Sequence, residues 1–267
     1  MRFKPESKAA RSPQQIAPSG IRKYFDLLLG MDDVISLGVG EPDFSVPWHV
    51  AEQAIYSLTK GYTSYTSNSG LLELRQAVSL WLEGLYGLVY DPEGEILITV
   101  GVSEGLDLAL RALVNPGDEV IIPEPCYVSY VPCTTLAGGV PVPVPTRHEQ
   151  GFKLDPDALE SAISPRAKIL LLNYPNNPTG STMTREELLP IAEVAEEHDL
   201  VVISDEIYDR LTYEGSHCPF ASLPGMKERT ILLNGFSKTY AMTGMRVGYA
   251  ASNPTFIALM SKIHQYT

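Results

Sequence analysis

The chain has 267 residues, of which 44% are hydrophobic and 19% charged, so it is long enough to bury a large core and lacks the composition of a disordered protein. Its formal net charge of −12 repels phosphate backbones and anionic lipids, which argues against nucleic-acid-binding and membrane-surface roles. Three cysteines without a CxxC pair, and a polar N-terminus with no apolar stretch behind it, argue against a disulfide framework and a signal peptide, so we expect a cytoplasmic protein.

The first 47 residues are expected to form an arm and an entry segment rather than part of a core. A polar stretch to about Gly20 precedes an amphipathic segment at 21–30, and a short apolar run at 34–40 ends in a turn. Helices are predicted at 50–60 and 71–87, on either side of a turn-rich stretch. We therefore divide the chain into an arm, 1–47, and one large domain, 48–267.

Beyond Asp91, short β-rich runs alternate with helical patterns. The strand candidates are 95–100, 119–123, 140–144, 168–173, 200–204, 230–234 and 245–251. The helical patterns between them are 105–114, 155–163 and 184–199. Because most of these strands are nearly continuous apolar runs, helices are expected to cover both of their faces. The pattern predicts an α/β fold with a mostly parallel sheet.

The last segment, 254–267, has apolar residues at helical spacing but no glycine cap and no proline after it. The helical pattern looks cut rather than finished. We therefore expect apolar residues such as Phe256 and Met260 to be exposed.

Two segments carry polar groups at the ends of predicted strands. In ITVGVSEGLDLAL a strand leads through a turn at Gly101 into a helix beginning near Ser103, and free backbone N–H groups with a serine hydroxyl can bind an anion. In NYPNNPTG (173–180), Asn177 presents an amide at the sheet edge where α/β folds bind ligands. Taken alone, the first pattern is also that of an ordinary helix cap, and the second that of an ordinary turn.

Two further segments carry charged groups. In VVISDEIYDRL (201–211), Asp205 follows a strand directly and can pair with a buried cation or cap a helix. In LLNGFSKTYAMTGMRVGYA (232–250), Lys238 is either a solvated lysine or, if shielded from water, an amine with a lowered pKa that can attack a carbonyl. Ser237 and Arg246 offer a hydroxyl and a guanidinium fork for a phosphate group.

Together and in this order, these segments resemble the class I and II aminotransferases of fold type I. The similarity runs from LGVGEPDF (37–44) to Tyr249, and its most specific parts are PNNPTG, SDEIY and SKTYAMTGMRVGY. Other phosphate-binding signatures and zinc-ligand spacings are absent from the sequence. The resemblance implies a pyridoxal 5'-phosphate (PLP) cofactor, no metal ion and a homodimer.

The resemblance also implies a role for each matching residue. Lys238 corresponds to the Schiff-base lysine, which also moves the substrate α-proton, and Asp205 to the carboxylate that keeps the pyridine nitrogen protonated. The other implied contacts are Tyr208 and Asn177 to the phenolic oxygen of the ring, Tyr127 stacked on the ring, Val102, Ser103, Ser237 and Arg246 to the phosphate, Tyr65 to the phosphate of the neighbouring subunit, and Gly40 to the substrate carboxylate.

Chains of this family continue into a small C-terminal domain that supplies an arginine for the substrate carboxylate, and this sequence contains no such segment. We interpret the protein as an aminotransferase that exchanges an amino group between an L-amino acid and a 2-oxo acid by a ping-pong mechanism. Another PLP reaction, such as carbon–sulfur lysis, and a truncated chain that binds the cofactor without turnover remain alternatives. A transcription regulator is least favoured, because no helix-turn-helix pattern precedes the domain.

Overall fold

The structure, a computed structural model, describes residues 8–18, 33–35 and 40–267. The amphipathic segment at 21–30 and the residues Leu37, Gly38 and Val39 therefore lie outside the described residues. A short helix in the arm, α1 (Arg11–Gln14), was not predicted from the sequence. The division of the chain at residue 48 stays a prediction.

Seven strands form one sheet in the order β1-β7-β6-β5-β4-β2-β3. The strands are β1 (Ile96–Thr99), β2 (Glu119–Glu124), β3 (Val140–Pro145), β4 (Ala167–Asn173), β5 (Val201–Asp205), β6 (Thr230–Gly235) and β7 (Gly248–Ala251). Strand β7 runs antiparallel to both of its neighbours, and every other pairing is parallel. The mostly parallel sheet is confirmed, and β7 departs from it, because the connection 236–247 contains only a 3-10 turn and returns the chain antiparallel beside β6.

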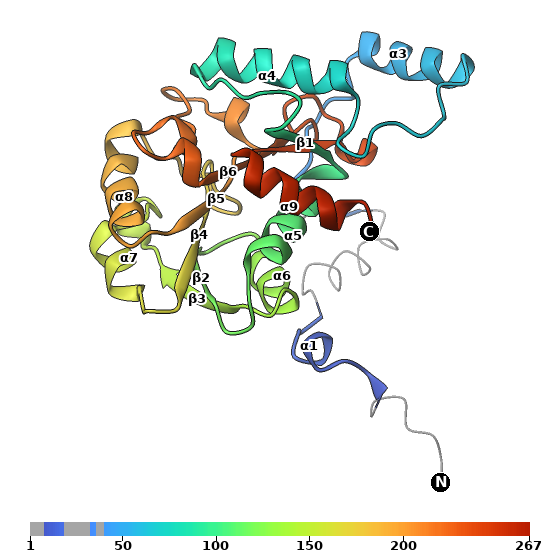
Figure 1. The fold of residues 1–267 in the computed structure, drawn as a ribbon. Helices are drawn as coiled ribbons and strands as arrows, with labels where there is room; N and C mark the ends of the chain where they lie inside the picture. The colour runs from blue at the N-terminus through green and yellow to red at the C-terminus, as the bar shows by residue number, and fades with distance from the viewer. Residues whose placement is uncertain (1–7, 19–32, 36–39) are drawn as a thin grey trace.

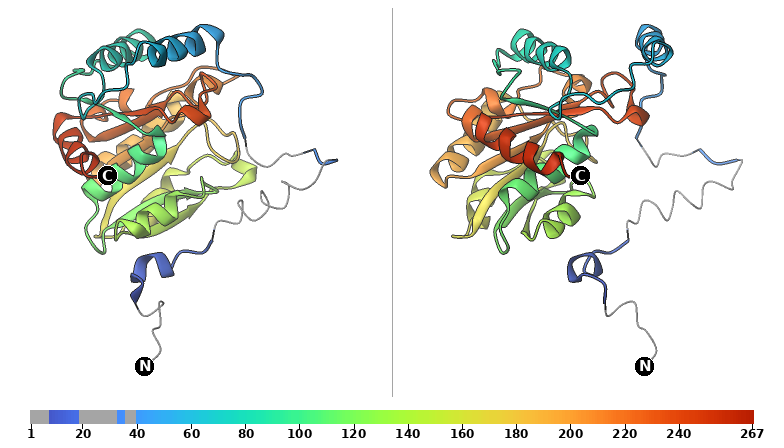
Figure 2. Two further views of the ribbon diagram at one scale, coloured as in Figure 1. Left: turned by 90° about the vertical axis from the view of Figure 1, so that its right-hand side faces the viewer. Right: turned by 45° about the vertical axis from the view of Figure 1, so that its right-hand side comes forward.

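Helices cover both faces of this sheet (Figures 1 and 2). One face packs against α5 (Gly101–Leu113), α6 (Tyr130–Leu136) and α9 (Pro254–His264). The other packs against α4 (Leu72–Tyr86), α7 (Pro156–Ala162) and α8 (Arg185–Glu197). Alternate residues of one strand point to opposite faces, so Leu171 lies in the first core and Leu170 in the second. The predicted two-sided cover is confirmed.

Local signals set several helix boundaries. Helix α8 begins with a capping box, in which Thr184 and Glu187 bond each other's backbone N–H groups. The Asp155 side chain caps the first turn of α7, and Asn253 caps α9 in the same way. These caps account for the close agreement between the predicted and the observed first residues of α7, α8 and α9.

Three predictions from the sequence were wrong in detail, and one helix, α6, was not predicted. Helix α5 begins at Gly101 rather than near Ser103. The strand expected at 245–251 begins only at Gly248, because Arg246 has a φ of 58° and ends the extended run. Met260 was expected to be exposed, yet it is fully buried against the α5 side of the core.

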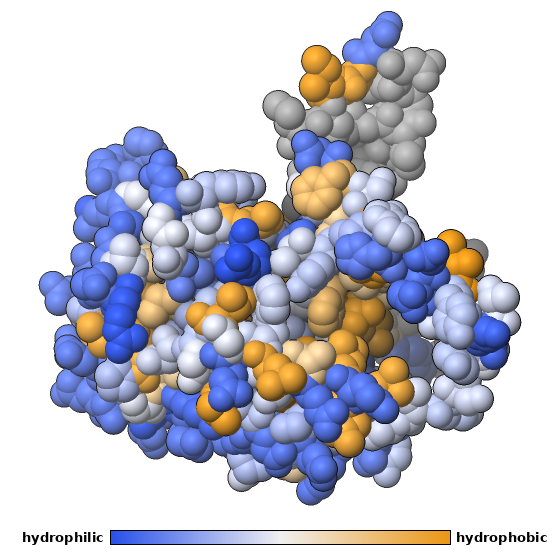
Figure 3. All heavy atoms as spheres, turned by 90° about the horizontal axis from the view of Figure 1, so that it is seen from above, coloured by the Kyte–Doolittle hydropathy of each residue, from blue (hydrophilic) through white to orange (hydrophobic). Residues whose placement is uncertain are grey.

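Helix α3 (Trp48–Thr59) is unlike the others, because none of its residues is buried. It lies beyond α4 at the outer edge of the molecule, away from the sheet (Figures 1 and 2). Trp48, Ile55 and Leu58 on this helix are 74%, 65% and 68% exposed. Figure 3 shows the surface from this side, where apolar side chains lie among charged ones. Among the described residues, no helix has both the length and the apolar character needed to cross a membrane.

Candidate functional site

The candidate site lies at the carboxyl ends of β4, β5 and β6. Asn173 and Asp205 are the last residues of β4 and β5, and they stand opposite each other in the strand register. Strand β6 ends at Gly235, only three residues before Lys238. Because neighbouring parallel strands end at the same sheet edge, these residues meet where α/β folds bind ligands.

Asp205 is a buried carboxylate held by neutral donors. Its side chain accepts two hydrogen bonds, one from the Tyr130 hydroxyl at Oδ2 (2.8 Å) and one from the Ile207 N–H at Oδ1 (3.2 Å). The Asn173 amide donates to its backbone carbonyl at 2.9 Å. Burial raises the pKa of Asp205 to about 6 against the lowering effect of these hydrogen bonds, and the charge of Glu206 adds to the rise.

No ion pair offsets the Asp205 charge in the part of the chain that the structure describes. A buried carboxylate without a cation is unstable in its charged form. The Asp205 side chain is therefore prepared to receive a cationic N–H group from a ligand.

Tyr208 and Asn177 lie beside each other at the same edge. Asn177 is fixed through its backbone N–H, which donates to Oδ1 of Asn173 at 2.8 Å. Burial and the Asp205 charge raise the pKa of the Tyr208 hydroxyl, and a hydrogen bond with the Asn177 side chain lowers it. Two polar groups from separate strand ends thus converge next to Asp205.

Lys238 faces this cluster from the segment that follows β6. Its Nζ donates to the carbonyl oxygen of Gly40 at 2.8 Å and lies 5.6 Å from the centre of the Tyr208 ring. Burial lowers the pKa of Lys238, with a further lowering from the Arg246 charge and an opposing effect of Glu41. A lowered pKa increases the fraction of neutral amine, which is the form that attacks carbonyls and accepts protons.

A second part of the site is suited to an anion. The first turn of α5 carries Val102 and Ser103, and N–H groups in a first turn have no partner within the helix. The Arg246 guanidinium lies directly over Gly101, since a Cβ on that glycine would stand 2.5 Å from Nη2. Ser237, which is 8% exposed, follows β6 on the way to Lys238. A helix start, a guanidinium and a hydroxyl are the donors that phosphate groups use in proteins.

Three glycine backbones hold this region together. A Cβ on Gly248 would lie 2.7 Å from the carbonyl carbon of Gly101 and from the backbone nitrogen of Val102. A Cβ on Gly235 would lie 2.8 Å from the Cα of Gly248. The end of β6, the start of β7 and the start of α5 are therefore in close backbone contact.

We expect Gly248→Ala to lower the free energy of unfolding by about 1–3 kcal/mol, because its methyl group would press on backbone atoms that cannot rotate away. Displacement of the α5 start should also weaken the binding of inorganic phosphate. Denaturant unfolding and ligand titration measure the two effects. The control is Gly84→Ala in α4, where a Cβ meets no atom within 4 Å and helix propensity favours alanine by roughly 1 kcal/mol. Equal stability of the two variants would contradict the close packing at Gly248.

Of the residues singled out in the sequence, the structure places Lys238, Tyr208 and Asn177 in one cluster beside Asp205, with Gly40 against Lys238. Tyr127 is half-buried near the cluster, with its ring 5.6 Å from that of Tyr130 and nearly perpendicular to it. Tyr65 is fully exposed and takes no part in the cluster within this chain. The functional contact of Tyr130 with Asp205 was not predicted, although EPCYVSY places this tyrosine one helical turn after Tyr127. Among the described residues, no group of three or more His, Cys, Asp or Glu side chains could hold a metal ion.

The chain matches known proteins over nearly its whole length. The family model "Aminotransferase class I and II" matches residues 32–266. A putative aminotransferase of Bacillus subtilis, YugH, is 53% identical over 253 residues, which are 95% of this chain and 66% of that protein. An aspartate aminotransferase of Pyrococcus abyssi is 47% identical over 252 residues, or 94% of this chain and 65% of that protein.

Solved structures agree with these matches. The aspartate aminotransferase of Thermus thermophilus with maleate superposes with a TM-score of 0.92 at 39% identity, covering 100% of this chain and 69% of that one. An aromatic aminotransferase of Pyrococcus horikoshii superposes with a TM-score of 0.87 at 44% identity, covering 93% of this chain and 66% of that one. The chain thus spans about two thirds of the length of the relatives it matches.

Proposed function

Because the chain belongs to the class I and II aminotransferase family, we propose that it holds PLP at the candidate site and moves an amino group between an L-amino acid and a 2-oxo acid. The observation that carries the proposal is the meeting of Lys238, Asp205 and Tyr208 at one sheet edge, beside the anion-binding start of α5. The expected exchange is of the ping-pong type, in which the amino donor leaves before the acceptor binds.

The residues present fit this cofactor. Asp205 is a buried carboxylate that no basic side chain of the described chain neutralises, as a partner for a pyridinium nitrogen must be. Lys238 is an amine with a lowered pKa, as a Schiff-base lysine must be. Arg246, Ser237 and the N–H groups of Val102 and Ser103 suit its phosphate group.

Each side chain then has a definite task. When bound, PLP supplies an aromatic ring that accepts the electron pair of the bond broken at the substrate α-carbon. The Asp205 carboxylate keeps a proton on the ring nitrogen, while the Tyr208 hydroxyl and the Asn177 amide bind the phenolic oxygen and Tyr127 covers one ring face. The Nζ of Lys238 is proposed to take the α-proton and return it at the neighbouring carbon. The Gly40 backbone, which contacts Nζ here, is placed to bind the substrate carboxylate.

The substrate is proposed only as a class. The names of the relatives include aspartate, aromatic amino acid and N-acetyl-LL-diaminopimelate aminotransferases, all at 44–47% identity. Sequence identity at this level therefore does not show whether the preferred substrate carries an acidic or an aromatic side chain.

A half-reaction screen tests the proposed activity. The PLP-loaded protein is mixed with each L-amino acid in turn, and the absorption of the cofactor is followed as it changes to that of the amino form. Conversion by at least one amino acid, reversed by a 2-oxo acid, is the expected result. Release of thiol or ammonia without the amino form would indicate a lyase, and no spectral change with any amino acid would contradict the proposed transfer.

We also propose a homodimer, in which α3 packs against a second copy. This helix exposes Trp48, Ile55 and Leu58, and Tyr65 just beyond it is free to reach a neighbouring site. We expect Ile55→Asp to shift the dimer towards monomer, because a charge in an apolar interface loses its hydration. Sedimentation at several protein concentrations measures the shift.

The matched control for the dimer is Tyr213→Asp. Tyr213 is 90% exposed and lies outside α3, in the loop before His217. The Tyr213→Asp variant should have the same sedimentation coefficient as the parent protein. A parent protein that sediments only as a monomer with saturating PLP would contradict the proposed dimer.

We further propose a cytoplasmic location. Cys126, Cys133 and Cys218 are all free thiols, which suits a reducing compartment. Fractionation of cells that express the protein is the test, and recovery from an oxidising compartment would contradict it.

A further inference from the structure

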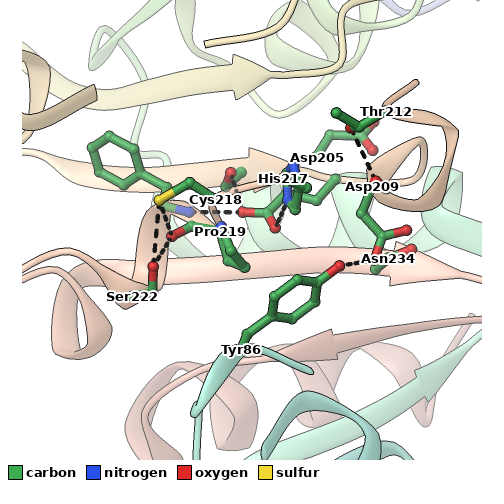
Figure 4. A network of polar contacts seen from close by, with 12 residues as sticks. Tyr86, Asp205, Asp209, Thr212, His217, Cys218, Pro219, Ser222 and Asn234 are labelled. Carbon is green, nitrogen blue, oxygen red and sulfur yellow. Dashed lines mark hydrogen bonds and ion pairs between the residues drawn. The ribbon is translucent and has the colours of Figure 1, made fainter. Parts of the chain in front are cut away.

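A second buried carboxylate, Glu206, follows Asp205 in the chain and is only 2% exposed. Its Oε1 accepts a hydrogen bond from the Ser204 hydroxyl at 2.8 Å and one from the Phe220 N–H at 3.0 Å. Its Oε2 lies 2.7 Å from Nε2 of His217. These contacts, part of the network in Figure 4, join the end of β5 to the far end of the segment 206–220.

His217 is enclosed by charged and aromatic groups. Its side chain is 8% exposed and its ring stands edge-on to that of Tyr86 at 5.7 Å, while the Tyr86 hydroxyl donates to Asp209 at 2.7 Å. Burial lowers the pKa of His217, but the Glu206 carboxylate and the Asp209 charge outweigh burial and the Arg210 charge, so the pKa is raised overall. The imidazole therefore keeps its positive charge to a higher pH than a free histidine does.

Glu206 acts on Asp205 in two ways. Its negative charge, one residue away, disfavours ionisation of Asp205 and raises the pKa of that carboxyl. Its hydrogen bonds also close the segment that carries Tyr208, because Ser204 precedes this segment and Phe220 ends it. A protonated His217, whose Nε2 lies 2.7 Å from Oε2 of Glu206, would offset the first effect and leave the second in place.

We propose that Glu206 and His217 are positioning residues for the cofactor ring: the hydrogen bonds of Glu206 hold the segment that carries Tyr208, and His217, paired with Glu206, offsets the Glu206 charge so that Asp205 can ionise. The inference rests on the proposed function, since Glu206 and His217 would act through Asp205 and Tyr208 of the same site. Neither residue lies among the contacts that the family resemblance implies.

Substitutions that remove one charge at a time separate this role from simple packing. Glu206→Gln removes the negative charge beside Asp205, so Asp205 should titrate at lower pH than in the parent. His217→Gln keeps an N–H donor but leaves the Glu206 charge uncompensated, so Asp205 should titrate at higher pH. The double variant should return towards the parent. A packing defect would move both single variants in the same direction or leave both unchanged.

The titration is read from the carboxyl carbon signal of Asp205 in cofactor-free protein labelled at aspartate, with Asp205→Asn to assign the signal. In a second measurement, the PLP dissociation constant is determined from pH 5 to 8. A higher Asp205 pKa in His217→Gln leaves fewer ionised carboxylates at a given pH, with a tenfold loss for each pH unit below the pKa. The variant should therefore bind PLP on the order of threefold to tenfold more weakly near pH 6.

Glu119→Gln is the matched control. Glu119 is a buried carboxylate that accepts a hydrogen bond from the Ser164 hydroxyl and pairs with Arg166, but it lies at the amino end of β2. The substitution should cost stability without moving the titration of Asp205. Shifts of the same sign in Glu206→Gln and His217→Gln, or no shift beyond that of Glu119→Gln, would overturn the proposal.

If Glu206→Gln does not fold, His217→Gln alone decides the question, since an Asp205 titration unmoved or lowered would overturn the proposal. The first measurement needs no cofactor, so its result is independent of the proposed function. Failure of the parent protein to bind PLP would contradict that function instead.

Discussion

Replacing Lys238 with alanine is expected to abolish the covalent attachment of PLP and to reduce any amino transfer by at least about 10²–10⁴-fold, the usual effect of removing a general base. The reason is position, because its Nζ lies within the candidate site, 5.6 Å from the centre of the Tyr208 ring. Lys153 and Lys168, in contrast, form ion pairs with Glu187 and Asp118. Borohydride reduction of the PLP-loaded protein, followed by peptide mass analysis, measures the attachment.

Lys168→Ala is the control for this experiment. Lys168 is a partly buried lysine in β4 that pairs with Asp118 at 2.7 Å, and its loss should leave the labelled peptide unchanged. Reductive labelling of any other lysine in the parent protein would show that the assignment of Lys238 is wrong.

Asp205→Asn is expected to have opposite effects on activity and on stability. Loss of the charge that keeps the ring nitrogen protonated should lower the rate of proton abstraction by about 10²–10³-fold, as loss of a preorganised electrostatic contact does elsewhere. In cofactor-free protein the same substitution should raise the free energy of unfolding at pH 7 to 8, because it removes a buried charge that has no cation beside it.

The sign of the stability effect follows from the pKa. Asp205 titrates at about 6 in the folded protein. An aspartate in an unfolded chain titrates near about 3.9. The folded state thus binds the proton more tightly, so the ionised group destabilises it by roughly 2–3 kcal/mol above pH 6, and this penalty disappears as the pH falls to about 4. Chemical unfolding of cofactor-free protein at pH 4 and pH 8 measures the difference. A variant less stable than the parent at pH 8 would contradict it.

The residues closest to the proposed chemistry could be predicted because each follows an apolar run. Asp205 is the last residue of β5 and Lys238 stands three residues past β6, and a buried strand can be predicted from its composition alone. The sheet itself and its two-sided cover were predictable for the same reason. Local patterns therefore indicated candidate polar groups at strand ends, and the resemblance to the family assigned them their roles.

Contacts between distant parts of the chain could not be predicted. Tyr130 and Asp205 are 75 residues apart, and no periodicity links a tyrosine in a short helix to a particular strand end. The pairing of Glu206 with His217 could not be predicted for the same reason, since the path of the intervening segment is set by packing. The left-handed backbone of Arg246 was hidden within an apolar stretch that reads as a strand.

The connection 236–247 is closed at its base by the register of Gly235 with Gly248 and by a hydrogen bond from the Phe236 N–H to the Val247 carbonyl at 3.1 Å. Lys238 and Arg246 therefore stand on one loop whose ends are already joined, which restricts how far apart the two side chains can move. With the contacts proposed above, a ligand would gain both only if the spacing of its carbonyl and its phosphate matched that of the two residues. Little ordering entropy is then lost on binding, and analogues with a longer or shorter phosphate arm give up one contact to keep the other.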